Sequence, residues 1–161
     1  MKQLANKHIL LCVTGGIAAY KAAEIIRLFK SSGSNVRVLM TKAAQEFITP
    51  LTMQALSGNQ VHVDLLDTEA EAAMGHIELA KWSDVILIAP CSANSISRLA
   101  AGKGDDLMTA VCLAAESKIF FDLKGFRTLK SITSALMPSE LSFSEVFKAR
   151  SVENPEPTIV I

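Results

Sequence analysis

The sequence predicts a three-layer α/β fold, in which helices cover both faces of an open parallel β-sheet. The first observation is that the apolar runs at residues 8–13 and 84–89 are almost continuous, as expected for parallel strands that are buried on both faces. The second is that segments with a helical spacing of apolar residues separate these runs. Strands that alternate with helices form parallel sheets with right-handed crossovers.

The first half of the chain contains three expected strands. After the strand His8–Val13, apolar residues recur at helical spacing over Ile17–Ser32, and Gly33 supplies a stop signal. Asn35–Met40 alternates between apolar and polar residues and is therefore the second expected strand. The other elements expected here are two short helices at 41–47 and 50–56 and a strand at 60–65.

The second half continues the alternation as far as Asp122. The expected elements are a helix at 76–82, a strand at 84–89, helices at 92–101 and 105–116, and a strand at 118–122. We interpret Asp105 and Asp106 as helix-start charges, because the helix dipole favours anions in the first turn. Beyond Asp122 the pattern weakens, and only a short helix at 141–150 is expected.

The composition argues against several classes of function. The 161 residues are 50% hydrophobic, which suits one domain with a substantial core. Sixteen basic and sixteen acidic residues give no basic excess for nucleic acid or an anionic membrane. The apolar runs are too short to span a bilayer, and the polar first residues do not resemble a signal peptide. Three cysteines without a CxxC pair favour a reducing cytoplasm, and no metal site is expected.

The first candidate binding motif is the turn Thr14-Gly15-Gly16 between a strand and a helix. Glycines let the backbone approach a ligand, and a helix N-terminus favours an anion. The turn is not GxGxxG, and the second strand ends in Met40-Thr41 without the acidic residue that binds an NAD ribose. A Gly-Gly turn also occurs in α/β proteins without a nucleotide, so this motif alone does not decide the function.

The second candidate motif is Ala89-Pro90-Cys91-Ser92-Ala93-Asn94-Ser95, at the carboxyl end of an expected strand. Open α/β sheets bind ligands at this edge, and hydroxyl and amide groups at a helix start suit a phosphate. Capping of the helix by Ser92 or Asn94 is the alternative. Because a cap needs only one polar residue, the cluster favours a ligand.

The third candidate is His76, which follows Gly75 at the start of an expected helix. It could act as a general base, although a lone histidine is more often structural. His8 and His62 lie in strand-like runs and are interpreted as structural. Cys12 and Cys112 are expected to be buried, and nothing near Cys91 in the sequence suggests a lowered pKa.

Together these segments resemble one family, the homo-oligomeric flavin-containing cysteine decarboxylases, and most closely their phosphopantothenoylcysteine decarboxylase type. The similarity covers roughly residues 7–116 and rests on VTGGIAAYK (13–21), MTKAAQEF (40–47), GHIELAKWSDVILIAPCSAN (75–94) and GKGDDLMTAVCLA (102–114). It implies a Rossmann-like flavoprotein fold that binds FMN. By this resemblance His76 is catalytic, and the residues that contact FMN are Gly15, Ile17, Thr41, Ser92, Asn94 and Ser95.

The resemblance also implies a reaction, a partner and a location. FMN would oxidise the cysteinyl thiol side of 4′-phosphopantothenoylcysteine to a thioaldehyde, which promotes loss of the carboxylate. Return of the hydride would then give 4′-phosphopantetheine, a step in coenzyme A biosynthesis. The family implies a trimer, or a multiple of trimers, with FMN sites at subunit contacts in the cytoplasm. In this chain Trp82 and the Met and Phe residues are expected to supply the apolar surface.

The chain departs from the family pattern after Glu116. The family continues with a Pro-Ala-Met-Asn type loop for the substrate carboxylate and a later flap cysteine, but no cysteine follows Cys112 here. We therefore expect an FMN-binding domain at 1–122, an atypical tail at 123–161, and poor turnover. Alternatives are a non-catalytic flavin-binding or regulatory subunit, a peptidyl-cysteine decarboxylase and, less favoured, a flavin prenyltransferase.

Overall fold

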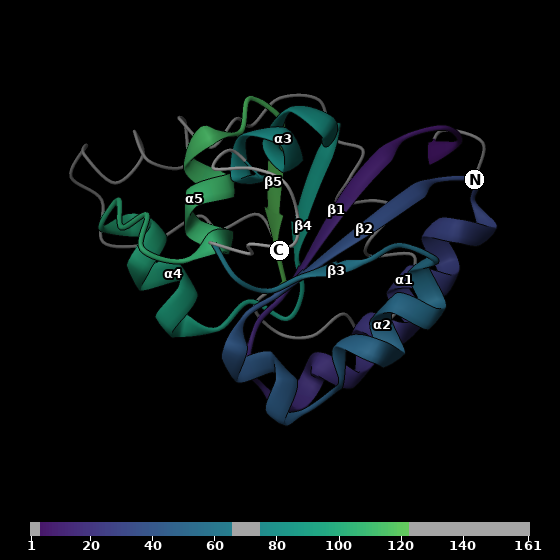
Figure 1. Ribbon diagram of the computed structural model, residues 1–161, viewed down its shortest axis with the longest axis horizontal. Coiled ribbons are helices and arrows are strands. Elements are labelled where there is room, and N and C mark those ends of the chain that lie inside the picture. The colour runs from purple at the N-terminus through teal and green to yellow at the C-terminus, as the bar shows by residue number, and fades with distance from the viewer. Residues whose placement is uncertain (1–3, 66–74, 123–161) are drawn as a thin grey trace, which may run out of the picture.

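The computed structural model describes residues 4–65 and 75–122. This part of the chain forms a parallel five-stranded sheet with the order β3-β2-β1-β4-β5 (Figure 1). The strands are β1 (His8–Val13), β2 (Asn35–Met40), β3 (Val61–His62), β4 (Val85–Ile88) and β5 (Lys118–Phe121). The predicted α/β class with an open parallel sheet is therefore confirmed.

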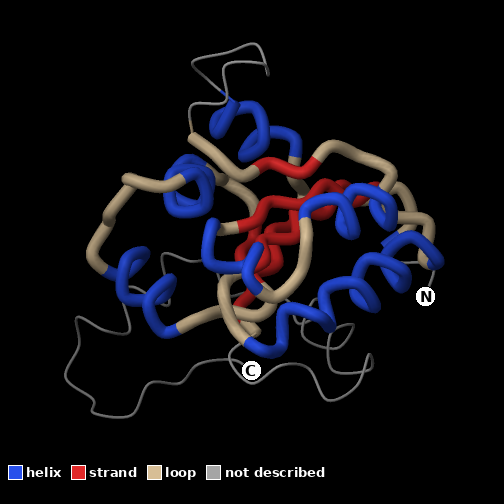
Figure 2. The backbone as a smooth tube through the Cα atoms, turned by 60° about the horizontal axis from the view of Figure 1, so that its bottom comes forward, coloured by secondary structure: helices blue, strands red, loops and turns tan. Residues whose placement is uncertain are grey.

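Helices cover both faces of this sheet (Figure 2). They are α1 (Ala22–Ser31), α2 (Pro50–Ser57), α3 (Gly75–Trp82), α4 (Ala93–Ala100) and α5 (Leu107–Ala114), with 3-10 helices at Ile17–Lys21 and Lys42–Glu46. One core cluster contains residues of α1 and α2, and a second contains residues of α3, α4 and α5. The sheet therefore forms the middle of three layers. None of the helices in the described ranges is long and apolar enough to cross a membrane.

The central strand β1 contributes to both core clusters, which explains its continuous apolar sequence. Ile9, Leu11 and Val13 pack toward α1 and α2, whereas Leu10 and Cys12 pack toward the other helices. All five side chains are fully buried. Burial of a Leu, Ile or Val side chain contributes about 1.5–3 kcal/mol, so this strand is a main source of stability.

In the first half of the chain, three predicted elements differ in detail from the structure. The segment predicted as one helix over 17–32 begins as a 3-10 helix, with a hydrogen bond from Ala19 N to Gly16 O at 2.9 Å. The helix expected at 41–47 is also 3-10. The third strand has only two residues because it lies at the sheet edge and pairs with β2 at two positions.

The last described strand ends just before the predicted domain boundary at residue 122. The chain pairs β5 with β4 over four positions, from Lys118 opposite Val85 to Phe121 opposite Ile88. The tail at 123–161, including the helix expected at 141–150, lies outside the described residues.

We expect Gly15→Ala to destabilise the protein, because a Cβ at this position would lie 2.6 Å from Ala43 Cβ. Overpacking of this kind typically costs about 1–3 kcal/mol of unfolding free energy. Gly16→Ala is a matched control, since a Cβ there has no neighbour within 4 Å and the backbone is extended, with φ at 169°. Urea denaturation measures both effects. Equal stability of the two variants would show that the close approach at Gly15 is not a constraint.

Candidate functional site

An open cleft of about 930 Å³ lies at the carboxyl edge of the sheet. Its walls come from the segments that follow β1, β2, β3 and β4 and from the starts of α4 and α5. This is the edge at which open α/β sheets bind ligands. The volume lies within the usual range of about 300–1,000 Å³ for small-molecule sites.

The hydroxyl of Thr14 connects two of these segments. Thr14 Oγ1 donates to Pro90 O at 2.7 Å and accepts from the Ser92 backbone N–H at 2.9 Å. Because Thr14 is only 1% exposed, both bonds are shielded from water. The end of β1 and the start of α4 are therefore held together before a ligand binds.

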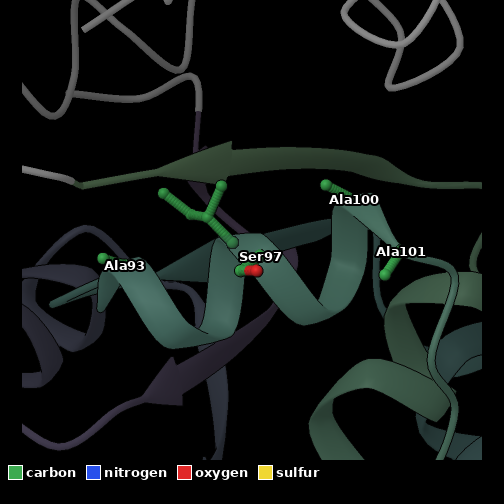
Figure 3. A pocket seen from close by; sticks show the side chains of 5 residues that line it. Ala93, Ser97, Ala100 and Ala101 are labelled. Atoms are coloured by element: carbon green, nitrogen blue, oxygen red, sulfur yellow. The ribbon is translucent and has the colours of Figure 1, made fainter.

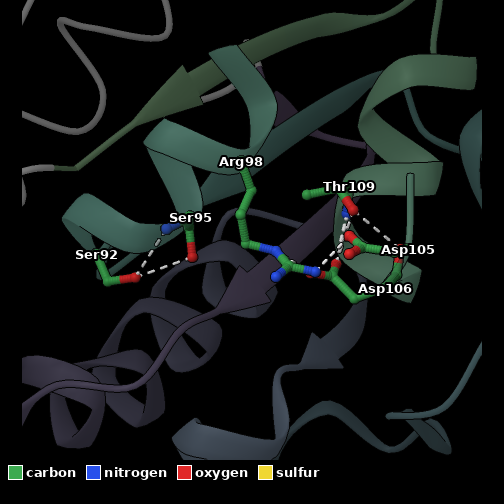
Figure 4. Close-up of polar contacts among 6 residues, drawn as sticks. All are labelled: Ser92, Ser95, Arg98, Asp105, Asp106 and Thr109. Carbon is green, nitrogen blue, oxygen red and sulfur yellow. Dashed lines mark hydrogen bonds and ion pairs between the residues drawn. The ribbon is translucent and has the colours of Figure 1, made fainter. Parts of the chain in front are cut away.

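The polar cluster at the start of α4 is a helix cap and also a part of the cleft wall. Ser92 Oγ accepts from Ser95 N at 3.2 Å and lies 2.9 Å from Ser95 Oγ, so Ser92 does cap α4, as the alternative interpretation of this cluster expects (Figure 4). The Ile96 N–H bonds to Ser92 O at 3.1 Å. The preceding N–H groups of Ala93 and Asn94 have no intrahelical acceptor, which leaves them for an anionic ligand.

Thr41, one of the residues that line the cleft, has an unsatisfied polar atom. Its Oγ1 is buried and has no hydrogen-bond partner among the described residues. Buried hydroxyls are normally hydrogen-bonded, because an unpaired one costs about 1–3 kcal/mol. A ligand that donates to this oxygen, or accepts from it, would remove that cost.

The charged side chains that line the cleft form ion pairs with one another. Lys42 Nζ lies 3.0 Å from Asp64 Oδ1, and Arg98 contacts Asp105 and Asp106. An anion in the cleft would therefore depend mainly on backbone N–H groups and hydroxyls. Sequence reasoning missed Arg98 and interpreted the two aspartates only as helix-start charges. In fact Asp106 is the N-cap of α5, which begins at Leu107 and not at Asp105.

The structure brings most of the predicted cofactor residues together but separates two predicted residues from them. The residues that line the cleft include Gly15, Thr41, Ser92, Asn94 and Ser95. Ile17 is 80% exposed and is not among the lining residues. His76 does not line the cleft of its own chain either.

His76 lies at the start of α3, a helix that is fixed at its opposite end. Trp82, the last residue of α3, packs against the His8 ring with centroids 4.8 Å apart, and Arg37 Cζ lies 4.6 Å from the Trp82 ring centroid. Arg37 also pairs with Glu78 at 3.5 Å. Because His8 begins β1, the Trp82 end lies at the amino edge of the sheet. His76 is about 9 Å farther along the helix axis, at 1.5 Å per residue.

The three cysteines are free and buried, as predicted for Cys12 and Cys112. Burial raises the pKa of the Cys91 thiol to about 12, and the nearby Asp122 adds to this rise. Burial likewise raises the pKa of Cys112 to about 12, with smaller contributions from Cys91 and Asp106. Nucleophilic attack requires the thiolate, so Cys91 is unsuited to it despite its position beside the cleft.

A second hollow of about 480 Å³ borders α4 (Figure 3). Its lining is mostly small and apolar and consists of Ala93, Ile96, Ser97, Ala100 and Ala101. A small-residue surface of this kind offers few polar groups to orient a ligand, so the cleft at the strand ends is the better candidate site.

The comparison with known families agrees with the fold and the position of the cleft. The family model described as "Flavoprotein" matches residues 1–121. The chain belongs to the flavoprotein family. The matched range contains the cleft-lining segments, so the resemblance seen in the sequence is confirmed at the level of the family.

Curated relatives of this flavoprotein include much longer proteins. The chain is 59% identical over 119 residues to the coenzyme A biosynthesis bifunctional protein CoaBC of Vibrio vulnificus (strain YJ016). It is 53% identical over 116 residues to the protein of the same name from Escherichia coli (strain K12). These alignments cover 74% and 72% of the chain but only 30% and 29% of the relatives. The chain therefore spans about 30% of the length of these curated relatives.

Solved structures with a similar fold include cysteine decarboxylases. The FMN-dependent cysteine decarboxylase SpaF is 30% identical, with a TM-score of 0.66, over 73% of this chain and 68% of SpaF. A variant of a PPC decarboxylase in complex with pantothenoylaminoethenethiol is 29% identical, with a TM-score of 0.61. That match covers 72% of this chain and 65% of the other.

Proposed function

We propose that this chain binds FMN in the cleft and is a decarboxylase of 4′-phosphopantothenoylcysteine in coenzyme A biosynthesis. The observation that carries the proposal is that the cleft is lined both by Thr41, whose buried Oγ1 has no partner among the described residues, and by Asn94 at the start of α4. Membership of the flavoprotein family supports the cofactor, and the CoaBC relatives support the reaction.

The described residues suit a flavin phosphate ester. Thr41 Oγ1 and the N–H groups at the start of α4 supply polar partners for the phosphate, and Gly15 lines the same cleft. Ser92 and Ser95 are already bonded to each other, so we propose that they contact FMN through their remaining hydrogen-bonding capacity. Ile17 stays a predicted contact, because it does not line the cleft in one chain.

In the proposed reaction the protein binds, orients and handles protons. FMN, when bound, supplies the two-electron chemistry at the cysteinyl carbon that makes loss of the carboxylate feasible. The cleft walls exclude water from one side of the bound substrate, and the starts of α4 and α5 orient it. We propose that the His76 imidazole takes the proton from the substrate thiol.

The position of His76 supports completion of the site by a second copy of the chain. His76 lies outside its own cleft, on a helix whose far end is fixed at the amino edge of the sheet. We therefore propose a homotrimer, or a multiple of trimers, with the cleft at a subunit contact. Cytoplasmic location stays a prediction, which the three free cysteines support.

A peptidyl-cysteine substrate is the second candidate. The similarity to SpaF, an FMN-dependent cysteine decarboxylase, favours it. A non-catalytic flavin-binding subunit is the remaining alternative. Assays of carbon dioxide release with phosphopantothenoylcysteine and with a peptide ending in cysteine separate the three.

Thr41→Val is expected to weaken FMN binding without destabilising the apoprotein. The substitution removes a hydroxyl that has no partner among the described residues, so the apoprotein loses no hydrogen bond. The loss of one ligand bond corresponds to about 1–3 kcal/mol, or roughly a 5- to 150-fold rise in Kd. Fluorescence titration with FMN measures the change, and Asn94→Ala is expected to act in the same direction. Asn35→Ala, at the far end of β2, is the control.

A colourless protein that takes up no added FMN would contradict the proposed cofactor. Equal Kd values for the unsubstituted chain and Thr41→Val would instead show that this hydroxyl is not a cofactor contact.

His76→Asn is expected to keep FMN but to lose the catalytic step. The proposed role of His76 is proton transfer from the substrate and not cofactor binding, so the variant should keep the flavin spectrum. Loss of a general base typically costs a factor of about 10²–10⁴ in rate. Single-turnover assays with parallel recording of flavin absorbance measure both properties. His62→Asn, on β3, is the matched control. Loss of FMN from His76→Asn would indicate a structural role.

The proposed trimer is tested by light scattering on the flavin-loaded protein. Large apolar side chains remain exposed at Ile17, Tyr20, Phe47, Leu51 and Leu113, as expected for surfaces that pack against another subunit. Among the side chains expected to supply this surface, Phe47 is exposed and Trp82 is partly exposed. The expectation is wrong for Met40, Met53 and Met108, which are buried. Leu51→Glu should shift the mass toward smaller species. A monomer with bound flavin would contradict the trimer.

A further inference from the structure

Arg98 lies on the cleft side of α4 and reaches across to the start of α5 (Figure 4). Its Nε donates to Asp106 Oδ2 at 3.0 Å, and its Nη2 donates to Asp105 Oδ1. The guanidinium therefore bonds two successive residues on the neighbouring segment. Such two-pronged contacts depend on the planar fork of arginine and are not reproduced by lysine.

Asp106 uses its two carboxylate oxygens for different purposes. Oδ1 caps α5, accepting from Thr109 N at 2.8 Å and from Thr109 Oγ1 at 3.0 Å. Oδ2 accepts from Arg98. The guanidinium is consequently attached to the residue at which α5 begins, and it fixes that helix start relative to α4.

The segment between α4 and α5 has few other restraints. Backbone N–H groups of Ala101, Gly102 and Lys103 bond back to carbonyls of α4. The following residues, Gly104 and Asp105, donate no such bond among the described contacts. Glycine lowers the cost of alternative backbone conformations, so the second half of the segment is held mainly through the side chain of Arg98.

This restraint bears directly on the cleft wall. Asp105, Asp106, Leu107 and Met108 all line the cleft, as does Arg98 itself. We propose that Arg98 is a positioning residue that holds the start of α5 in place as the cofactor-facing wall, which raises the affinity for FMN. The inference rests on the proposed FMN binding. Its physical basis is preorganisation, because a wall that is already ordered loses less entropy when the ligand binds.

The test compares FMN binding by Arg98→Gln and by a neutralised variant of the whole cluster. Arg98→Gln should raise Kd about tenfold, mainly through faster dissociation, which corresponds to the loss of one well-placed contact. Partly exposed ion pairs add little to global stability, so the apoprotein should unfold at nearly the same denaturant concentration. Arg27→Gln, on the exposed side of α1, is the control.

The neutralised variant separates positioning from simple charge balance. Arg98→Gln alone leaves two carboxylates without their cation, and these could repel the FMN phosphate. The triple variant Arg98→Gln, Asp105→Asn, Asp106→Asn removes that repulsion while keeping the cap, since Asn caps helices as well as Asp does. If Arg98 positions the wall, the Kd of the triple variant for FMN should stay as high as that of Arg98→Gln. Recovery of the original Kd and dissociation rate would overturn the proposal.

Amide hydrogen exchange on the apoprotein gives a second readout that needs no flavin. The backbone N–H groups of residues 104–109 should exchange faster in Arg98→Gln than in the unsubstituted chain, whereas the exchange rates of the sheet strands should be unchanged. Unchanged exchange there, or an unchanged Kd when the unsubstituted chain binds FMN, would contradict the role of Arg98 alone. Failure of the unsubstituted chain to bind FMN would contradict the proposed function, and the role assigned to Arg98 would fall with it.

Discussion

The shape of the cleft depends on the hydroxyl of Thr14. It uses its hydrogen for Pro90 O and a lone pair for the Ser92 N–H, and it is almost fully buried. The Ser92 N–H would lose this partner without it, and a buried unpaired group costs about 1–3 kcal/mol. Pro90 O would keep only the longer bond from the Thr14 backbone N–H, at 3.4 Å. Through this one side chain, the glycine turn after β1 and the helix start after β4 are fixed relative to each other. The other cleft residues come from α4 itself, from the ends of β2 and β3 and from the start of α5.

The sheet could be predicted from the sequence because its signals are local. The continuous run of apolar residues in β1 indicates that this strand is buried on both faces. Gly33, Gly58 and Gly102 have positive φ and lie where helical segments end. The length of β3 could not be predicted, because an edge strand extends only as far as its single neighbour pairs with it. The 3-10 helices could not be predicted either, because 3-10 and α-helical hydrogen bonding fit the same spacing of apolar residues.

The site was predictable only where a motif carries its own chemistry. The polar cluster at Ser92–Ser95 marked both a cap and a cleft wall. Thr14 and Arg98 gave no comparable signal, because their importance comes from partners that the fold brings near. Thr14 forms hydrogen bonds with Pro90 and Ser92, which are 76 and 78 positions farther along the chain. Arg98 forms its ion pairs with carboxylates on the far side of a glycine-containing segment. Whether the predicted residues contact FMN stays a prediction until binding is measured.

The supports of the cleft and of His76 are separate, and this has a mechanistic consequence. The cleft is held at the carboxyl edge by Thr14 and by the contacts of Arg98. His76 depends on α3, which is fixed by Trp82 and Arg37 at the amino edge. A change at one support therefore need not disturb the other. Under the proposed function, cofactor affinity and proton transfer would be set by different residues, so flavin binding and turnover could vary independently.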